Sequence, residues 1–305
     1  MGAGAGAEVT LDLAMATSRT IGQERLMGKV YDALRRAEAQ RSEAGDDPRA
    51  RVPSVVSTLD RAKVRVQAPF WQRWLGRKRR LVLEDGTALN KRRISLLRPD
   101  SFVAEQFRTL RARIDSISAE HPIRSIAMTS AVAGEGKTVS AVNFALVNAM
   151  SVGRRVLLID CDLRNPKVHA ALGLQPEAGL AEVLLDRANL ADAITKVEGV
   201  SLEVLPVRGQ PANPSELLAS DRMRALVEEV SQTYDRVVLD TPPVLALPDA
   251  KTVSDYCDAI LLVVQAGSTA TVDISATLEV LDRRRVLGVV LNGVEDASDH
   301  YGYPG

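Results

Sequence analysis

The chain has 305 residues, of which 46% are hydrophobic and only 4% aromatic, and its 39 basic and 39 acidic residues give no formal net charge. This length and composition allow one large α/β core with an additional segment. The neutral balance gives no overall attraction to nucleic acid, and no such partner is expected. Cys161 and Cys257 are too few and too far apart in sequence for a disulfide framework or a cysteine metal cluster. No run of about 18 apolar residues is present, so no membrane span is expected.

Residues 1–98 are predicted to be an extension that precedes this core. Residues 1–26 are of low complexity, whereas residues 27–42 have the pattern of an amphipathic helix. Met27 is therefore as good a candidate for the true start as Met1. The opening residues also lack the cationic segment of a signal peptide.

Residues 61–98 form a basic stretch, with twelve lysines and arginines against two acids. A solvated, partly disordered linker has this composition. A peripheral membrane contact is the alternative, because both tryptophans lie among basic residues between Trp71 and Arg80. Tryptophan beside a basic cluster suits an anionic lipid surface.

A helix is expected from Ser101 to Ser118, with Asp100 or Ser101 as its N-cap. Its charged residues Glu105, Arg108 and Arg111 are spaced by three and share one face. Taken alone, this pattern is typical of a surface ion-pair ladder.

A phosphate-binding loop is predicted between a strand at residues 125–128 and a helix at residues 139–150. The intervening sequence AVAGEGKT differs from the usual GxxxxGK[ST] only in its first residue, Ala131. Such a loop offers backbone N–H groups and a lysine to the β- and γ-phosphates, and a hydroxyl to Mg²⁺. The predicted nucleotide-binding residues are Ala133, Gly134, Glu135, Gly136, Lys137, Thr138 and Val139.

Two further apolar strands end in carboxylates. One precedes Asp160 and Asp162, and the other, RVVLD, ends in Asp240. Open parallel sheets bind ligands beyond the carboxyl ends of their strands, so Thr129, Asp160 and Asp240 are expected to converge on one site. Carboxylate oxygens with the hydroxyl of Thr138 suit a hard cation such as Mg²⁺.

The remaining pattern alternates strands and helices up to residue 294. It predicts a short helix at 179–186, strands at 200–207, 259–264 and 287–291, and a helix at 272–284. A further helix should begin at Asn213, with Glu216 closing a capping box. The predicted class is therefore α/β: a P-loop NTPase domain at residues 99–294 with a mostly parallel sheet flanked by helices. Residues 295–305 form a predicted mobile tail in which Tyr301 and Tyr303 are accessible.

Together these motifs resemble the bacterial tyrosine kinases of capsule and exopolysaccharide systems, the cytoplasmic CpsD/CapB-type autokinases. The resemblance covers about Pro99 to the C-terminus. It rests on AVAGEGKT as Walker A, VLLIDCDLRNP as Walker A′, VVLDTPP as Walker B, the segment ANPSELL, and the ExxRxxR pattern of Glu105, Arg108 and Arg111.

The resemblance implies an ATP- and Mg²⁺-dependent protein-tyrosine autokinase of the deviant Walker class. The implied roles are Lys137 on the transferring phosphate, Thr138, Asp162 and Asp240 at Mg²⁺, Asp160 as the base for the tyrosine hydroxyl, and Asn292 at adenine. It further implies a ring of subunits that contact one another through ExxRxxR and phosphorylate each other's Tyr301 and Tyr303. A separate transmembrane chain-length determinant would activate the kinase and hold it at the cytoplasmic side of the inner membrane.

A switch ATPase of the MinD/ParA type is the principal alternative, because it shares the fold and the loop. Those proteins carry a second lysine in the loop where this chain has Val132. An iron–sulfur carrier ATPase would need a CxxC motif, which the sequence lacks. A non-catalytic export scaffold would not need the full set of Lys137, Asp160, Asp162 and Asp240.

Overall fold

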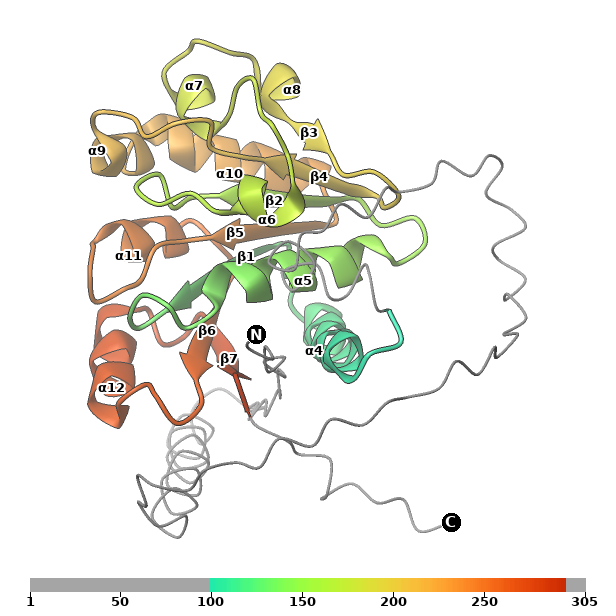
Figure 1. Ribbon diagram of the computed structural model, residues 1–305, viewed down its shortest axis with the longest axis vertical. Coiled ribbons are helices and arrows are strands. Elements are labelled where there is room, and N and C mark those ends of the chain that lie inside the picture. The colour runs from blue at the N-terminus through green and yellow to red at the C-terminus, as the bar shows by residue number, and fades with distance from the viewer. Residues whose placement is uncertain (1–98, 295–305) are drawn as a thin grey trace, which may run out of the picture.

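The computed structural model describes residues 99–294. Their centre is a seven-stranded sheet in the order β3-β4-β2-β5-β1-β6-β7, and every neighbouring pair except β3 and β4 is parallel (Figure 1). The strands are β1 (Ser125–Ser130), β2 (Val156–Asp160), β3 (Thr195–Lys196), β4 (Leu202–Leu205), β5 (Arg236–Asp240), β6 (Ala259–Gln265) and β7 (Val286–Asn292). The expected mostly parallel α/β architecture is confirmed.

Both faces of the sheet are buried, so its central strands are apolar on both sides. Ile126 and Met128 of β1 face one core cluster, and Ala127 between them faces the other. This alternation follows from the two-residue period of a strand. A parallel sheet covered on both faces explains why these strands read as continuous apolar runs in the sequence.

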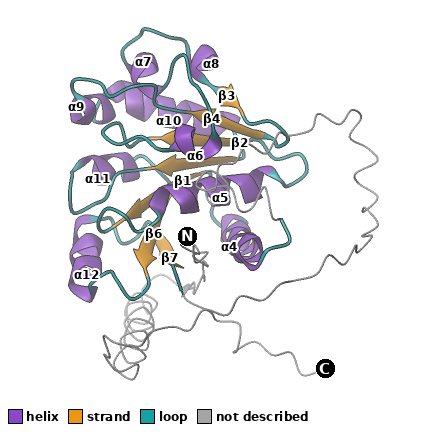
Figure 2. Cartoon of the chain, in the orientation of Figure 1, coloured by secondary structure: helices purple, strands orange, loops and turns teal. Residues whose placement is uncertain are grey.

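Helices cover the two faces as separate layers (Figure 2). The cluster on one face includes residues of α4 (Phe102–Ser118), α5 (Lys137–Ala149) and α6 (Val168–Leu172). On the other face lie α7 (Leu180–Leu184), α8 (Leu190–Ala193), α9 (Pro214–Leu218), α10 (Asp221–Thr233) and α11 (Asp249–Ser254). The last helix, α12 (Thr271–Val280), packs on β6 and β7.

Helix α4 begins where the sequence predicts. The hydroxyl of Ser101 accepts a hydrogen bond from the backbone N–H of Ala104, so Ser101 and not Asp100 is the N-cap. Phe107, Leu110 and Ile114 are fully buried against α5 and the sheet. This contact attaches the helix with the ExxRxxR pattern to the phosphate-binding domain.

Two local predictions are wrong. The helix predicted at residues 272–284 ends at Val280, because Leu281 is extended and Asp282 forms a turn with Arg284. No capping box forms at Asn213, since its side-chain amide donates to the carboxylate of Glu216 instead of capping the backbone. Helices α8, α10 and α11 were not predicted from the sequence. Of these, α10 is the longest, and its buried residues Met223, Leu226, Val227 and Val230 follow a helical spacing.

Several predicted features lie outside the described residues. They are the helix at residues 27–42, the basic stretch at 61–98 with its tryptophan pair, and the tail at 295–305. Within residues 99–294, no helix is both long and apolar enough to cross a membrane.

Candidate active site

The carboxyl ends of three adjacent strands assemble the site. Strand β5 lies between β1 and β2 and runs parallel to both. Asp160 and Asp240 are direct register partners, and Met128 of β1 pairs with Asp240 from the other side. The predicted convergence of these three strand ends is therefore confirmed, and it places two carboxylates beside the loop that follows β1.

The loop between β1 and α5 depends on two glycines with positive φ. Gly134 has φ of 96° and Gly136 has φ of 84°, a region that favours glycine. A Cβ on Gly136 would also lie 1.9 Å from Nδ2 of Asn292, which packs against the loop. That same Nδ2 donates to the carbonyl of Glu135 at 2.9 Å. Asn292 at the end of β7 therefore supports the loop backbone at the N-terminus of α5.

The side chain of Glu135 turns inward. Its carboxylate accepts the backbone N–H of Val132 at 2.9 Å and the hydroxyl of Thr269, and the residue is almost completely buried. Glu135 thus fixes the loop conformation through its side chain. Val132, Ala133 and Gly134 remain exposed at the tip of the loop.

Lys137 makes an ion pair with the end of β5. Its Nζ lies 2.8 Å from Oδ1 of Asp240 and 3.8 Å from Oδ2 of Asp162. The side chains of Lys137 and Asp240 are 8% and 0% exposed. Burial is the largest single influence and would lower the pKa of Lys137, but the attraction of Asp240, Asp162 and Asp160, together with the hydrogen bond to Asp240, raises that pKa. The lysine is therefore a fixed positive charge among carboxylates.

Asp160 is completely buried and bonded to backbone. Its Oδ2 accepts the N–H groups of Lys167 and Val168 at 3.1 and 3.0 Å, and its Oδ1 accepts the N–H of Asp162 at 3.2 Å. Burial, followed by repulsion from Asp240, raises the pKa of Asp160. These bonds hold the Walker A′ loop around the carboxylate.

Asp162 is the more accessible carboxylate of this loop. Burial raises its pKa, which neighbouring Lys137 partly offsets. Its Oδ1 accepts the N–H of Asn165 at 3.0 Å, and its Oδ2 faces Lys137.

The donor set fits a hard cation. Oδ2 of Asp240 is buried and has no hydrogen-bond partner among the described residues. A buried carboxylate oxygen without a partner is costly unless something else binds there. The hydroxyl of Thr138 lies nearby, 3.4 Å from Nζ of Lys137. Thr138, Asp162 and Asp240 offer only oxygen ligands, as Mg²⁺ prefers.

A second group of polar residues beside the site was not predicted from the sequence. Arg164, which follows Asp162, bonds through Nε to Oδ2 of Asp249 at 3.3 Å and through Nη2 to Oγ of Ser215 at 2.8 Å. Ser215 in turn donates to Oδ1 of Asp249 at 2.5 Å. Ser215 belongs to the ANPSELL segment, so that segment was recognised as a motif without this contact. No signal in the sequence indicated Asp249.

The ExxRxxR residues make contacts within their own chain. Arg108 pairs with Glu105 at 2.7 Å, as the surface ladder interpretation predicts, and also bonds to the carbonyl of Pro99. Arg111 instead donates at 2.7 Å to the carbonyl of Val147 and at 2.7 Å to the hydroxyl of Ser151, at the C-terminal end of α5.

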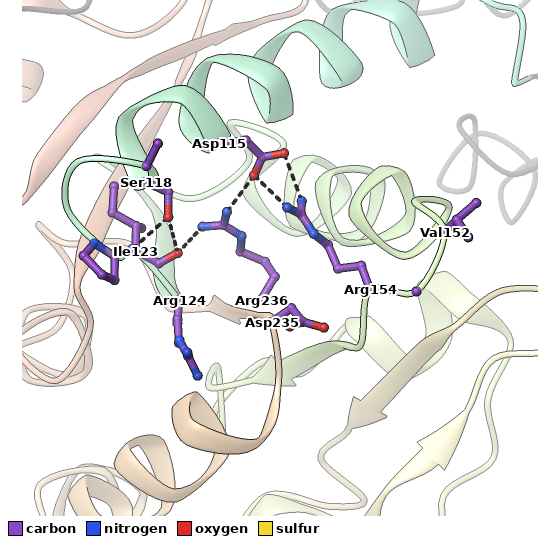
Figure 3. A pocket seen from close by; sticks show the side chains of 11 residues that line it. Asp115, Ser118, Ile123, Arg124, Val152, Arg154, Asp235 and Arg236 are labelled. Atoms are coloured by element: carbon purple, nitrogen blue, oxygen red, sulfur yellow. Dashed lines mark hydrogen bonds and ion pairs between the residues drawn. The ribbon is translucent and has the colours of Figure 1, made fainter.

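A hollow of about 520 Å³ lies at the opposite, amino edge of the sheet (Figure 3). Asp115 of α4 binds both Arg154 and Arg236 there, each at 3.0 Å. Arg236 is 2% exposed and also donates to the carbonyl of Ile123. These bonds fasten α4 to the sheet. The residues of the hollow include none of the strand-end carboxylates, so it is separate from the candidate active site.

A glycine loop, a buried lysine and strand-end carboxylates on a parallel sheet define a P-loop nucleotide-binding protein. A protein-family model described as "AAA domain" matches residues 123–286, which agrees with this class. The chain is 38% identical over 224 residues to the tyrosine-protein kinase YwqD of Bacillus subtilis, covering 72% of this chain and 94% of that protein. The chain belongs to the bacterial tyrosine-protein kinases.

A relative and a solved structure extend this comparison. The succinoglycan biosynthesis transport protein ExoP of Rhizobium meliloti is 37% identical over 205 residues, which cover 66% of this chain but 26% of ExoP. The kinase domain of the Escherichia coli tyrosine kinase ETK superposes with a TM-score of 0.63 at 34% identity, over 70% of this chain and 84% of that domain. The fold predicted from the sequence and the family resemblance are both confirmed.

Proposed function

We propose that this chain transfers the γ-phosphate of ATP to tyrosine hydroxyls of neighbouring copies, in the control of capsule or exopolysaccharide synthesis. The observation that carries the proposal is the position of Lys137 between Asp240 and Asp162 at the carboxyl ends of β2 and β5. The reaction converts ATP and a tyrosine hydroxyl into ADP, phosphotyrosine and a proton. The similarity to YwqD supports the acceptor, and that to ExoP supports the polysaccharide context.

The loop and Lys137 bind the phosphates in this proposal. The N–H groups from Ala133 to Val139 surround the helix N-terminus, where an anion is favoured. Lys137 leaves Asp240 and reaches the transferring phosphate, which frees the carboxylate of Asp240. Thr138, Asp162 and Asp240 are the residues that would hold Mg²⁺, which would supply neutralisation of the charge on the phosphates. Phosphoryl transfer requires mainly such positioning and charge neutralisation.

Asp160 is the proposed acceptor of the tyrosine proton. A tyrosine hydroxyl near pKa 10 must lose its proton during transfer, and a nearby carboxylate can take it. Three backbone N–H groups keep Asp160 in one orientation at the strand end. Asn292 is the proposed contact for adenine, and it lies beside the loop through its hydrogen bond to the carbonyl of Glu135.

Tyr301 and Tyr303 are the proposed acceptors, delivered between subunits of a ring. Glu105 is the exposed member of the proposed subunit contact, and Arg108, which pairs with it, is half-buried. A separate transmembrane chain-length determinant is the proposed activator. It would place the chain at the cytoplasmic side of the inner membrane, with the segment from Trp71 to Arg80 as a further proposed lipid contact.

Incubation of the purified full chain with Mg-ATP, followed by mass spectrometry of its tyrosine peptides, tests the proposal. Phosphate on Tyr301 or Tyr303 is expected both with and without an activator peptide. The level of phosphorylation should differ between these two conditions. Tyr234 should stay unmodified, because it is buried and its hydroxyl bonds to Glu203. ATP hydrolysis with no phosphotyrosine would contradict the proposal and favour a switch ATPase. Lys137→Met and Asp160→Asn should each abolish phosphotyrosine.

A further inference from the structure

We propose that three basic side chains beside the active site, Arg164, Lys167 and Arg208, select acceptor tyrosines that have acidic neighbours. These three residues are called the basic cluster below. The inference rests on the proposed kinase function and adds a substrate class to it, namely acidic tyrosine-containing peptides.

The basic cluster comes from two loops at the same edge of the sheet as the carboxylates. Arg164 and Lys167 lie between β2 and α6, and Arg208 lies between β4 and α9. Because β2 and β4 are parallel neighbours, their following loops emerge side by side. The side-chain amide of Gln210 donates to the carbonyl of Arg164 and joins the two loops. The three side chains of the basic cluster therefore lie on one surface.

All three members are exposed and able to bind a ligand. Within residues 99–294, the side chains of Lys167 and Arg208 form no ion pair with an acidic residue. Arg164 is 43% exposed although it pairs with Asp249. That buried carboxylate and Ser215 hold the guanidinium in place. A fixed guanidinium loses less side-chain freedom on binding than a free one.

Lys167 lies next to the proposed catalytic base, Asp160. Its backbone N–H donates to Oδ2 of Asp160, so it is separated from the proposed base by one hydrogen bond. A tyrosine that gives its proton to Asp160 would lie beside this loop. An acidic residue close to that tyrosine would then meet the basic cluster.

The other side of the site is apolar. The N–H of Leu245 donates to the carbonyl of Ala131 at 3.2 Å, which places the loop after β5 on the phosphate-binding loop. Leu245 and Val132 are 38% and 36% exposed. Residues 241–248 contain no charged side chain. An aromatic ring can contact this side while acidic groups face the basic cluster.

The chain itself contains an acidic segment with tyrosines, which is complementary in charge to the basic cluster. Residues 293–305 include Glu295, Asp296 and Asp299 together with both proposed acceptor tyrosines, and no lysine or arginine. Asp299 precedes Tyr301 by two positions. Opposite charges on the two partners favour encounter and suppress wrong substrates. The foremost expected substrate is therefore this segment of a second copy.

The test uses two peptides and one enzyme. The enzyme is the full chain with Tyr301→Phe and Tyr303→Phe, so that neither proposed acceptor of the chain competes with the added peptide, and phosphate is measured on the peptide alone. One peptide has the sequence of residues 293–305, and its match carries Glu295→Gln, Asp296→Asn and Asp299→Asn. Phosphate transfer with Mg-ATP gives kcat/KM for each, and fluorescence anisotropy with Mg-ADP gives Kd.

The acidic peptide should have about tenfold higher kcat/KM and about tenfold lower Kd, since exposed ion pairs contribute little each and three act together. This preference should disappear at about 0.5 M salt, because salt at that concentration screens interactions between exposed charges. Lys167→Gln with Arg208→Gln should reduce it to about threefold or less. Because those two side chains are exposed, this double variant avoids the buried Asp249 contact that Arg164→Gln would break. Arg124→Gln removes one positive charge at the amino edge of the sheet and should keep the full preference.

Equal kcat/KM and equal Kd for the two peptides would overturn the inference. So would a preference that survives in the double variant and in Arg164→Gln. Preferential binding without any phosphate transfer would leave the acidic-peptide site standing and refute the proposed kinase function. Phosphate transfer to both peptides with equal kcat/KM and equal Kd would support the proposed kinase function and refute the acidic-peptide site.

Discussion

Nζ of Lys137 lies 2.8 Å from Oδ1 of Asp240, and both side chains are almost completely buried. The lysine expected to bind phosphate is thus held by the carboxylate expected at Mg²⁺. Removing one member of a buried pair leaves the other charge without compensation, at a cost of about 3–5 kcal/mol. Nucleotide binding must replace this pair with contacts at least as favourable.

Lys137→Met is therefore expected to destabilise the free protein as well as to abolish phosphotransfer. Asp240→Asn should also destabilise it. The double variant should recover much of the lost free energy of unfolding, because neither charge is then buried alone, and it should remain inactive. Urea denaturation of the four proteins measures the coupling. Strictly additive losses would show that the pair contributes nothing to stability.

The two glycines of the loop should differ in their tolerance of alanine. Both have positive φ, so each substitution carries a backbone strain of about 1 kcal/mol. Only Gly136 also faces a contact, 1.9 Å from Nδ2 of Asn292, whereas nothing lies within 4 Å of a Cβ on Gly134. Gly136→Ala should therefore weaken nucleotide binding more than Gly134→Ala, as measured by calorimetric titration. Adding Asn292→Ala should partly restore the Gly136 variant, and equal losses for the two glycines would contradict the contact argument.

Alanine substitutions of Arg108 and Arg111 should distinguish an effect on subunit assembly from an effect on folding stability. Arg111→Ala removes two hydrogen bonds at the end of α5 and should lower stability by about 1–2 kcal/mol. Arg108→Ala removes an exposed pair with Glu105 and a bond to Pro99, and should change stability by less than about 1 kcal/mol. If the proposed ring contact is correct, both variants should sediment as smaller species than the unmodified chain. A full-sized assembly of Arg108→Ala would argue against that contact.

Asp282 provides a pH-dependent reporter away from the active site. Hydrogen bonds from Arg284 lower the pKa of Asp282 to about 2. A carboxyl whose folded pKa is depressed stabilises the fold above its unfolded pKa, and this contribution is lost as pH falls through about 2. Because Arg284 is 82% exposed, salt should weaken the effect. Carbon-detected NMR titration should find the low pKa, and Arg284→Gln should return it toward the ordinary value of 3.8.

Much of the fold followed from local patterns. The strand before the glycine loop, the helix after it and the carboxylates at the ends of β2 and β5 were predicted because apolar periodicity and strand-end polarity are local properties. The helix α10 was omitted although its apolar spacing is regular. The end of α12 was misplaced because the turn at Asp282 depends on its hydrogen bonds to Arg284.

The phosphate-binding loop, the alternation of strands and helices that predicts a parallel sheet, and the three carboxylates can all be recognised from residues adjacent in the chain. The contacts of those groups depend on how distant segments pack together. The tertiary structure paired Lys137 with Asp240, 103 positions away, and brought Asn292 onto Glu135 across 157 positions. It also joined Arg164 to Asp249 across 85 positions. Strand order and loop packing set such contacts, and no local pattern records them.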